Sequence, residues 1–241
     1  MKITQKLAAK MRDIYASPAV TLAFLGDSVT QGCFEVYKTG ENSLQPVFDP
    51  ASSYPVRLGH MLEALYPGAP VHIVNAGLSG CDAKTGLERL ARDVLAYSPD
   101  LTVVCFGLND SSRGTDYLPT YRASLRGIFT ELRRAGSEVI FLTPNGMNRY
   151  VSPHVTDAFT RSLAEHFRDV MESGTFDAFM RAGREEARAC GAAVCDVYAK
   201  WKAFEEGGAD MTALLANHMN HPVRELHALF AGSLADTIFT E

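Results

Sequence analysis

The chain has 241 residues, of which 46% are hydrophobic and 21% are charged. That length suits one larger α/β domain or two small ones, and the composition excludes disorder, collagen and coiled coil as the main state. The 23 basic and 28 acidic residues give a formal charge of −5. There is thus no basic excess to neutralise phosphates, and we expect no nucleic-acid partner.

No apolar run approaches the roughly 18 residues of a membrane span, and charged residues interrupt the first 17 positions. We therefore expect neither a membrane segment nor a signal peptide. The five cysteines are odd in number and form no CxxC pair. Their pattern favours a reduced, cytoplasmic protein over a disulfide framework.

Five short, mainly apolar runs alternate with longer amphipathic segments. The strands expected from these runs cover residues 20–25, 71–74, 101–106, 139–142 and 192–195. Apolar stripes at three- and four-residue spacing predict helices around residues 87–95, 121–132, 159–171, 176–187 and 223–238. Regular alternation predicts an α/β fold, with a parallel sheet covered by helices on both faces.

One piece of the chain does not fit this alternation. Residues 37–53 show neither the apolar run of a strand nor the three- and four-residue spacing of a helix. The segment is too long for an ordinary connection between elements. We expect an irregular insertion loop there, with a functional or lid-like role.

Small and polar residues follow the first four expected strands, and two histidines precede the last helix. In an open α/β sheet, ligands bind beyond the carboxyl ends of the strands, so these segments should meet at one site. The segments are 26–32 (GDSVTQG), 75–80 (NAGLSG), 107–110 (GLND), 143–148 (TPNGMN) and 217–222 (NHMNHP).

The first of these segments places Ser28 on a sharp turn. On its own, Gly26-Asp27-Ser28 would also suit a glycine turn with an ordinary helix cap. No Gly-Lys-Ser/Thr follows, which excludes a phosphate-binding loop, and no G-x-S-x-G elbow is present.

Taken together, four blocks in order resemble the motifs of the GDSL, or SGNH, family of serine esterases and lipases. The blocks are Gly26-Asp27-Ser28, the stretch from Asn75 to Gly80, the stretch from Gly107 to Asp110, and His221-Pro222. The resemblance spans most of the chain. It implies a single domain over residues 1–241 with a three-layer, flavodoxin-like fold and strand order 2-1-3-4-5.

The resemblance also implies a role for each motif residue. Ser28 would be the nucleophile, and His221 would accept its proton and later protonate the leaving alcohol. The oxyanion hole would combine the backbone N–H groups of Ser28 and Gly80 with the side-chain amide of Asn109. Activity should rise through a histidine pKa near ~6–7.

The sequence departs from the family three residues before the histidine, where the usual aspartate is His218. Two alternatives remain open. A backbone carbonyl could orient His221 in a Ser28–His221 dyad, or another acid could reach it, the nearest upstream being Asp210. A simpler role for Asp210 is to cap a short helix over residues 211–216.

The sequence leaves two alternatives to serine chemistry. His218, His221 and His227 could form a metal site, but Pro222 argues against a shared helix face and no HExxH motif is present. We therefore expect no metal and no cofactor. Cys33 and Cys81 flank the motifs closely enough that a thiol nucleophile must be tested.

These observations predict a cytoplasmic serine hydrolase acting on a small-molecule carboxylic ester, with a short acyl group such as acetyl and an alcohol such as a sugar. The alternatives are a lysophospholipase or thioesterase, and a non-catalytic ligand-binding module on the same fold. The sequence does not reveal an oligomeric state.

Overall fold

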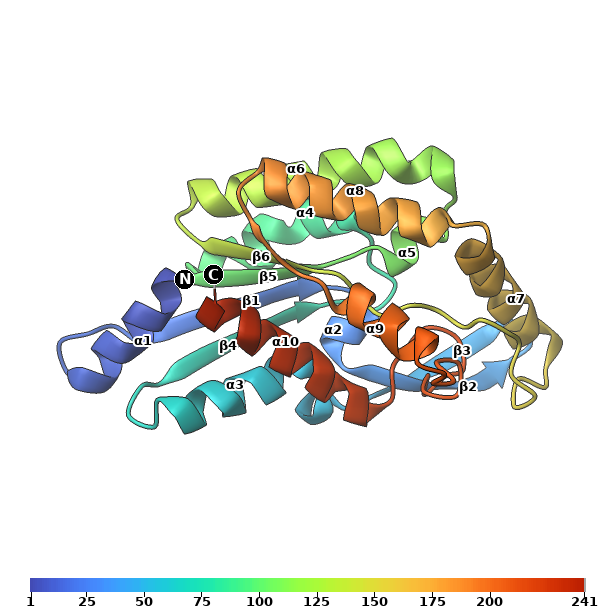
Figure 1. Ribbon diagram of the computed structural model, residues 1–241, viewed down its shortest axis with the longest axis horizontal. Helices are drawn as coiled ribbons and strands as arrows, with labels where there is room; N and C mark the ends of the chain where they lie inside the picture. The colour runs from blue at the N-terminus through green and yellow to red at the C-terminus, as the bar shows by residue number, and fades with distance from the viewer. Residues whose placement is uncertain (241) are drawn as a thin grey trace.

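The computed structural model describes residues 1–240, in which five parallel strands form one sheet ordered β4-β1-β5-β6-β7 (Figure 1). Counted along the chain, these strands lie in the order 2-1-3-4-5, so the predicted topology is confirmed. Their bounds are β1 (Val20–Gly26), β4 (Val71–Gly77), β5 (Leu101–Cys105), β6 (Glu138–Leu142) and β7 (Ala193–Cys195).

Helices cover both faces of this sheet, which gives the predicted three layers. In Figure 1, α4, α6 and α8 lie on one face, while α1, α3 and α10 lie on the other. The helices are α1 (Lys2–Arg12), α2 (Ser28–Gln31), α3 (Tyr54–Leu65), α4 (Ala83–Asp93), α5 (Leu108–Ser111), α6 (Leu118–Arg134), α7 (Ala158–Glu172), α8 (Thr175–Ala189), α9 (Val197–Glu206) and α10 (His227–Thr240). Short 3₁₀ turns span Pro50–Ser52, Leu95–Tyr97, Thr115–Tyr117 and Arg224–Leu226.

The core explains why these segments form these elements. All five residues of β5 are buried, as expected for a central parallel strand covered on both faces. The stripe of α6 is buried against the sheet and its neighbouring helices; it comprises Tyr121, Leu125, Ile128, Phe129 and Leu132.

The register of the sheet brings the sequence motifs together. Gly26 at the end of β1 is paired with Gly77 of β4 on one side and with Cys105 of β5 on the other. The loops after these three neighbouring strands therefore leave the sheet side by side. Ser28, Gly80 and Asn109 lie on those loops.

The expectation of an irregular segment at 37–53 is wrong for most of its length. Strands β2 (Cys33–Gly40) and β3 (Ser43–Phe48) form an antiparallel hairpin, and the 3₁₀ turn Pro50–Ser52 follows it. The hairpin forms a separate two-stranded sheet with most of its residues partly or fully exposed, so it lacks the apolar alternation that would reveal it. That it is an insertion or a lid stays a prediction.

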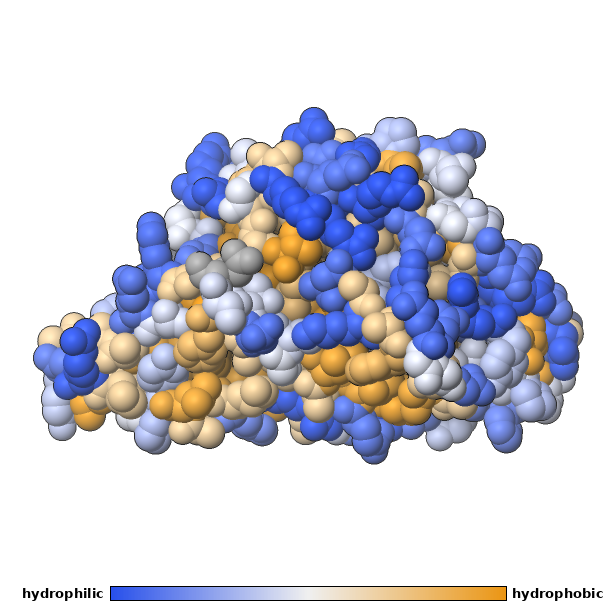
Figure 2. Space-filling view, in the orientation of Figure 1, coloured by the Kyte–Doolittle hydropathy of each residue, from blue (hydrophilic) through white to orange (hydrophobic). Residues whose placement is uncertain are grey.

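The surface combines hydrophilic and apolar areas. Figure 2 shows hydrophilic residues over the upper part of the view and hydrophobic residues gathered over the region of α3 and α10. None of the helices within residues 1–240 has the length and apolar character needed to cross a bilayer.

Candidate active site

Ser28 lies at the first position of a short helix that begins immediately after β1. Asp27 caps this helix, since its Oδ1 accepts the backbone N–H of Val29 at 3.0 Å. Gly32 ends the helix after one turn with a left-handed φ of 90°. The turn thus holds the Ser28 hydroxyl at the carboxyl edge of the sheet, with the residue 5% exposed.

His221 meets Ser28 across 193 residues of sequence. Its Nε2 lies 2.9 Å from Ser28 Oγ, and its Nδ1 lies 2.9 Å from the backbone oxygen of Phe34. A carbonyl oxygen can only accept a hydrogen bond, so Nδ1 carries the proton and Nε2 is free to accept from the hydroxyl. This is the tautomer that a histidine base needs.

Asn217 holds the loop that carries His221. Its Oδ1 accepts the backbone N–H groups of Met219, Asn220 and His221 at 3.0, 2.9 and 3.0 Å. Its Nδ2 donates to Asn220 Oδ1 at 2.8 Å. The sequence analysis placed Asn217 in a segment of the expected site but gave it no role, although an asparagine four residues before the histidine in a loop is a recognisable turn signal.

The glycine-containing loop after β4 packs directly against the serine turn. Leu78 donates its N–H to the carbonyl of Gly26 at 3.1 Å. A Cβ on Gly77 would lie 2.3 Å from the backbone nitrogen of Gln31, so only glycine fits there. Gly80 has a φ of +76°, a conformation that favours glycine, and its N–H donates to no group within residues 1–240.

Asn109 follows β5 and contributes a side-chain amide to the same edge. Its Nδ2 donates one hydrogen bond to the carbonyl of Cys81 at 2.9 Å, which fixes the amide and leaves its second N–H available. The next residue, Asp110, accepts the N–H of Ala83 at 2.9 Å and ties the loop to α4. Ser28 lies in the first turn of α2, where backbone N–H groups have no intrahelical acceptor. The site therefore offers three neutral donors from three adjacent loops.

The structure does not bring Asp210 to His221. The Asp210 carboxylate accepts the Tyr150 hydroxyl at 2.7 Å and the N–H of Ala213 at 3.1 Å. The bond to Ala213 is the predicted capping contact, but residues 211–214 form a turn and the expected helix over 211–216 is absent. The group on His221 Nδ1 is the Phe34 carbonyl.

The other two histidines of the suggested metal group have different surroundings. His218 has a φ of +57° and stacks on His154, with ring centroids 5.0 Å apart. His227 is fully buried, and its Nδ1 accepts the N–H of Tyr54 at 3.1 Å. Within residues 1–240, no three His, Cys, Asp or Glu side chains are grouped so as to hold a metal ion.

Burial dominates the electrostatics of the site. Desolvation lowers the pKa of His221 to about 4, opposed only by the hydrogen bond to the Phe34 carbonyl. Burial likewise raises the pKa of Asp27 and of Asp110 to about 7. Each of these two carboxyls has one oxygen, Oδ2, without a hydrogen-bond partner among the described residues.

The lowered pKa of His221 moves the expected acid limit of activity. A histidine that accepts a serine proton must be neutral, so if His221 is the base, kcat/KM should fall only as the pH drops through about 4, well below the range expected from sequence. An acid limb near ~6.5, in protein that is still folded, would contradict this burial effect.

Two controls separate this limb from other acid effects. Between the unperturbed value of 6.5 and about pH 4, the unfolded state binds more protons than the folded state, so the protein loses stability as the pH falls through this range. Circular dichroism must therefore be recorded at each pH at which a rate is measured. Asp27→Asn keeps the helix cap and removes a carboxyl that titrates near 7. The fall in kcat/KM near pH 4 should persist in this variant.

The cysteines near the motifs are not poised to react. Cys33 and Cys81 are buried, and desolvation raises the pKa of Cys33 to about 12 and that of Cys81 above its ordinary value. All five cysteines are free thiols. The cytoplasmic location stays a prediction.

Cys33→Ala and Cys81→Ala should each keep kcat within about threefold of wild type per folded molecule, because a protonated buried thiol is a poor nucleophile. Iodoacetamide should inactivate the native protein slowly or not at all. Loss of ester hydrolysis in either alanine variant, with Ser28→Ala still active, would instead identify a cysteine nucleophile.

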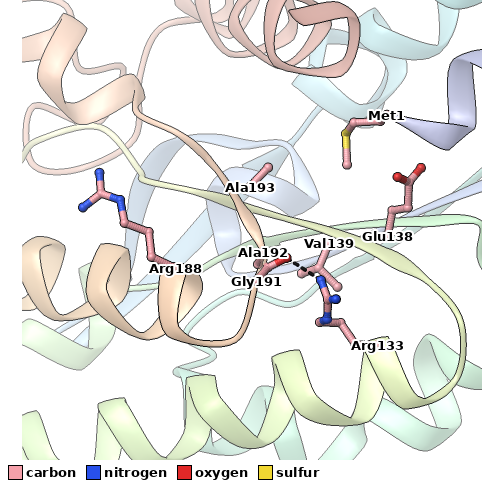
Figure 3. A pocket seen from close by; sticks show the side chains of 8 residues that line it. All are labelled: Met1, Arg133, Glu138, Val139, Arg188, Gly191, Ala192 and Ala193. Atoms are coloured by element: carbon pink, nitrogen blue, oxygen red, sulfur yellow. Dashed lines mark hydrogen bonds between the residues drawn. The ribbon is translucent and has the colours of Figure 1, made fainter. Parts of the chain in front are cut away.

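A different hollow lies at the opposite edge of the sheet, at the amino ends of β6 and β7 (Figure 3). It has a volume of about 400 Å³ and is lined by Met1, Arg133, Glu138, Val139, Arg188, Gly191, Ala192 and Ala193. Arg133 donates to the carbonyl of Gly191. This hollow holds no nucleophile beside a base and lies at the edge where α/β sheets do not usually bind ligands.

Comparison with known proteins agrees with this geometry. A model of the GDSL-like lipase/acylhydrolase family matches residues 24–229, a segment that contains all four sequence motifs. The chain belongs to this family. Together with the relative described next, membership makes the protein a carboxylic ester hydrolase, as predicted.

Individual relatives are esterases and lipases. An acetylxylan esterase from Geobacillus stearothermophilus is 30% identical over 160 residues, which is 63% of this chain and 69% of the relative. The solved structure of an acetylxylan esterase from that organism has a TM-score of 0.67 at 24% identity, covering 92% of this chain and 95% of that chain. A lipase/acylhydrolase from Enterococcus faecalis has a TM-score of 0.64 at 23% identity, with coverages of 91% and 95%. At these identities the two structures show a shared fold.

Proposed function

We propose that this ester hydrolase uses Ser28 as its nucleophile and His221 as its base, and that it removes acetyl groups from hydroxyl-rich alcohols such as sugars. The observation that carries the mechanism is the 2.9 Å contact between Ser28 Oγ and His221 Nε2. The Nδ1 contact to a carbonyl, which leaves Nε2 unprotonated, supports the same division of roles.

The reaction follows from these positions. His221 Nε2 takes the hydroxyl proton as Ser28 Oγ attacks the ester carbonyl carbon, which converts the carbonyl oxygen to an oxyanion. When the intermediate collapses, the bond to the alcohol oxygen breaks and His221 returns the proton to that oxygen. Water then attacks the acyl-serine by the same route, which releases the acid and restores Ser28.

The oxyanion is the charge that the site must stabilise. The Ser28 and Gly80 backbone N–H groups and the free N–H of Asn109 come from the loops after β1, β4 and β5. Neutral donors fixed before the reaction stabilise such a charge without reorganising during it. We assign these three groups to the oxyanion hole.

His221 needs no carboxylate partner to keep its Nδ1–H tautomer. The Phe34 carbonyl accepts the Nδ1–H of His221, which is the position that the aspartate of the usual motif would occupy. A neutral carbonyl holds the ring but stabilises the imidazolium less than a carboxylate does. The low pKa of His221 agrees with that loss.

Asp210→Asn should therefore reduce kcat by less than about tenfold, since this carboxylate bonds Tyr150 and not the histidine, whereas His221→Ala should cost more than ~10³. The measurement is kcat for p-nitrophenyl acetate with both variants and wild type. A collapse in Asp210→Asn as deep as that of His221→Ala would make Asp210 the third member of a triad.

A polar hollow beside the His221 loop supports a hydroxyl-rich alcohol. It has a volume of about 240 Å³ and is lined by residues of β2, of the 154–160 segment and of the loop at 216–218. Its polar side chains include the ion pair Lys38–Asp157, at 3.3 Å, and the imidazole rings of His154 and His218. Such a lining suits alcohols that offer many donors and acceptors better than a long acyl chain.

A substrate panel tests the proposed specificity. We expect kcat/KM to be highest for acetylated xylo-oligosaccharides and for acetyl over octanoyl p-nitrophenyl esters. Higher values for lysophospholipids or acyl thioesters would identify the corresponding alternative activity. A fluorophosphonate probe should label wild type and not Ser28→Ala; absence of both labelling and hydrolysis would favour a non-catalytic binding module.

A further inference from the structure

The carbonyl that orients His221 lies on the hairpin and not on the main sheet. In the hairpin register, Cys33 is paired with Phe48 and Val36 with Pro46. Two residues of β2, Phe34 and Glu35, therefore face one residue of β3, which is a β-bulge. A bulge removes backbone groups from the ladder, so the Phe34 carbonyl is free to accept from His221.

An isolated two-stranded hairpin is only marginally stable, so the position of this carbonyl needs another support. Arg224 contacts β2 and the residue that follows β3, at the bulged end of the hairpin. Its guanidinium donates to both Glu35 oxygens, at 2.6 and 3.1 Å, and to Asp49, immediately after β3, at 2.9 Å. It also lies 4.3 Å from the centroid of the Phe34 ring.

The same arginine is linked to both members of the proposed dyad. It lies three residues after His221 in the chain. Asp49, one of its carboxylate partners, donates its backbone N–H to the carbonyl of Gly32 at 2.8 Å. Gly32 ends the helix that begins with Ser28. Arg224 thus connects the histidine segment, the carbonyl that orients the ring, and the end of the serine helix.

We propose that Arg224 is a positioning residue that holds the Phe34 carbonyl against His221, so that an ion-paired hairpin replaces the aspartate of the usual motif. The proposal rests on the proposed function of the Ser28–His221 dyad. Among residues 1–240, the hydrogen bonds of the Arg224 guanidinium go to Glu35 and Asp49 and not to Ser28 or the His221 ring, so Arg224 would act through the Glu35–Phe34 backbone. Guanidinium suits this role because its planar fork binds one carboxylate with two bonds while donating to a second.

The test compares Arg224→Ala with Arg184→Ala. Arg184 is a matched control, because it also forms a two-bond ion pair, with Asp196 at 2.7 and 2.9 Å, and lies near an aromatic ring, that of Tyr198, away from the hairpin. We expect Arg224→Ala to lower kcat by about 10- to 100-fold with KM changed less than about threefold, since small misplacement of a catalytic group has that scale of effect. Arg184→Ala should keep kcat within about twofold of wild type.

A second readout reports on the ring itself. In protein labelled with ¹⁵N-histidine, NMR should show His221 as the Nδ1–H tautomer in wild type and Arg184→Ala, and as a mixture in Arg224→Ala. Arg224→Lys, which keeps the charge but loses the fork, should recover only part of kcat. Glu35→Gln keeps the side-chain volume and should shift kcat and tautomer in the same direction, even if Arg224→Ala does not fold.

The outcomes separate this proposal from the proposed function. Wild-type kcat and an unchanged tautomer in folded Arg224→Ala or Glu35→Gln would overturn the positioning role. Full activity in Ser28→Ala would overturn the serine mechanism, whereas the tautomer measurement would still report whether Arg224 orients the ring.

Discussion

Replacing Ser28 with alanine is expected to lower kcat for p-nitrophenyl acetate by roughly 10³-fold or more while leaving the fold intact. The hydroxyl is the group of this residue that lies within hydrogen-bond distance of His221, and the cap of α2 is the Asp27 side chain. Alanine is also a good helix former at the position it would occupy. Steady-state kinetics with circular dichroism checks both parts of the expectation.

Three further variants make this result specific. His221→Ala should lose as much activity, and the double variant should lose little more, because two groups that act as one unit are not additive. Ser137→Ala is the matched control: Ser137 is a buried serine whose hydroxyl bonds Thr102 at 3.0 Å just before β6, at the opposite edge of the sheet. Near-wild-type activity in Ser28→Ala would show that this residue only starts the helix.

The sheet could be predicted from the sequence because its strands carry strong local signals. Each of the central strands β1, β5 and β6 is a short run that is apolar at nearly every position, with a glycine or a proline at its end or within two residues of it. The position of the site followed from the rule for parallel sheets, since the loops after neighbouring strands must meet. Both features depend on residues adjacent in sequence.

Helices α1, α3 and α9 were not predicted, and their sequences explain why. In α1, four of the eleven residues are charged, and the buried apolar residues are Ile3 and Leu7 alone. Pro55 and Gly59 interrupt the pattern of α3. In α3, packing against the rest of the protein outweighs a weak local preference. Helix α9 contains good helix formers but buries only Val197, Tyr198 and Trp201, which is too few for an apolar stripe to be recognised.

The group that orients His221 could not have been identified from sequence. Any residue has a backbone carbonyl, and the one on Phe34 is 187 positions away from the histidine. Its availability depends on a bulge in a hairpin whose strands show no apolar alternation. The departure at His218 raised the question, but only the fold brings the Phe34 carbonyl to Nδ1.

The low pKa of His221 was missed for a related reason. A reference value near 6.5 assumes a solvated ring, whereas here the ring is buried and has no carboxylate beside it. Sequence can indicate which residue is the base. The pKa of His221 depends on the burial of its ring and on a neutral hydrogen-bond partner, the Phe34 carbonyl, from a strand distant in sequence.

Asn109→Ala should lower kcat by roughly 10²- to 10³-fold with a much smaller change in KM, because an oxyanion donor acts mainly in the transition state. One amide hydrogen of Asn109 is bound to the Cys81 carbonyl, which orients the other, and alanine removes both. Asn109→Asp is a sharper variant: it keeps the size but replaces the donor with an acceptor, so it should be at least as damaging.

A buried asparagine elsewhere distinguishes catalysis from stability. Asn148 donates its amide to the carbonyls of Tyr150 and Ala164 at 3.0 and 2.8 Å, so Asn148→Ala should lower the melting temperature while kcat of the folded protein changes little. Asn109→Ala should show the opposite balance, with a large fall in kcat and a smaller thermal shift. If the effect of Asn109→Ala is confined to KM, this amide binds the ground-state ester, and the oxyanion must then be stabilised by the backbone N–H groups of Ser28 and Gly80 alone.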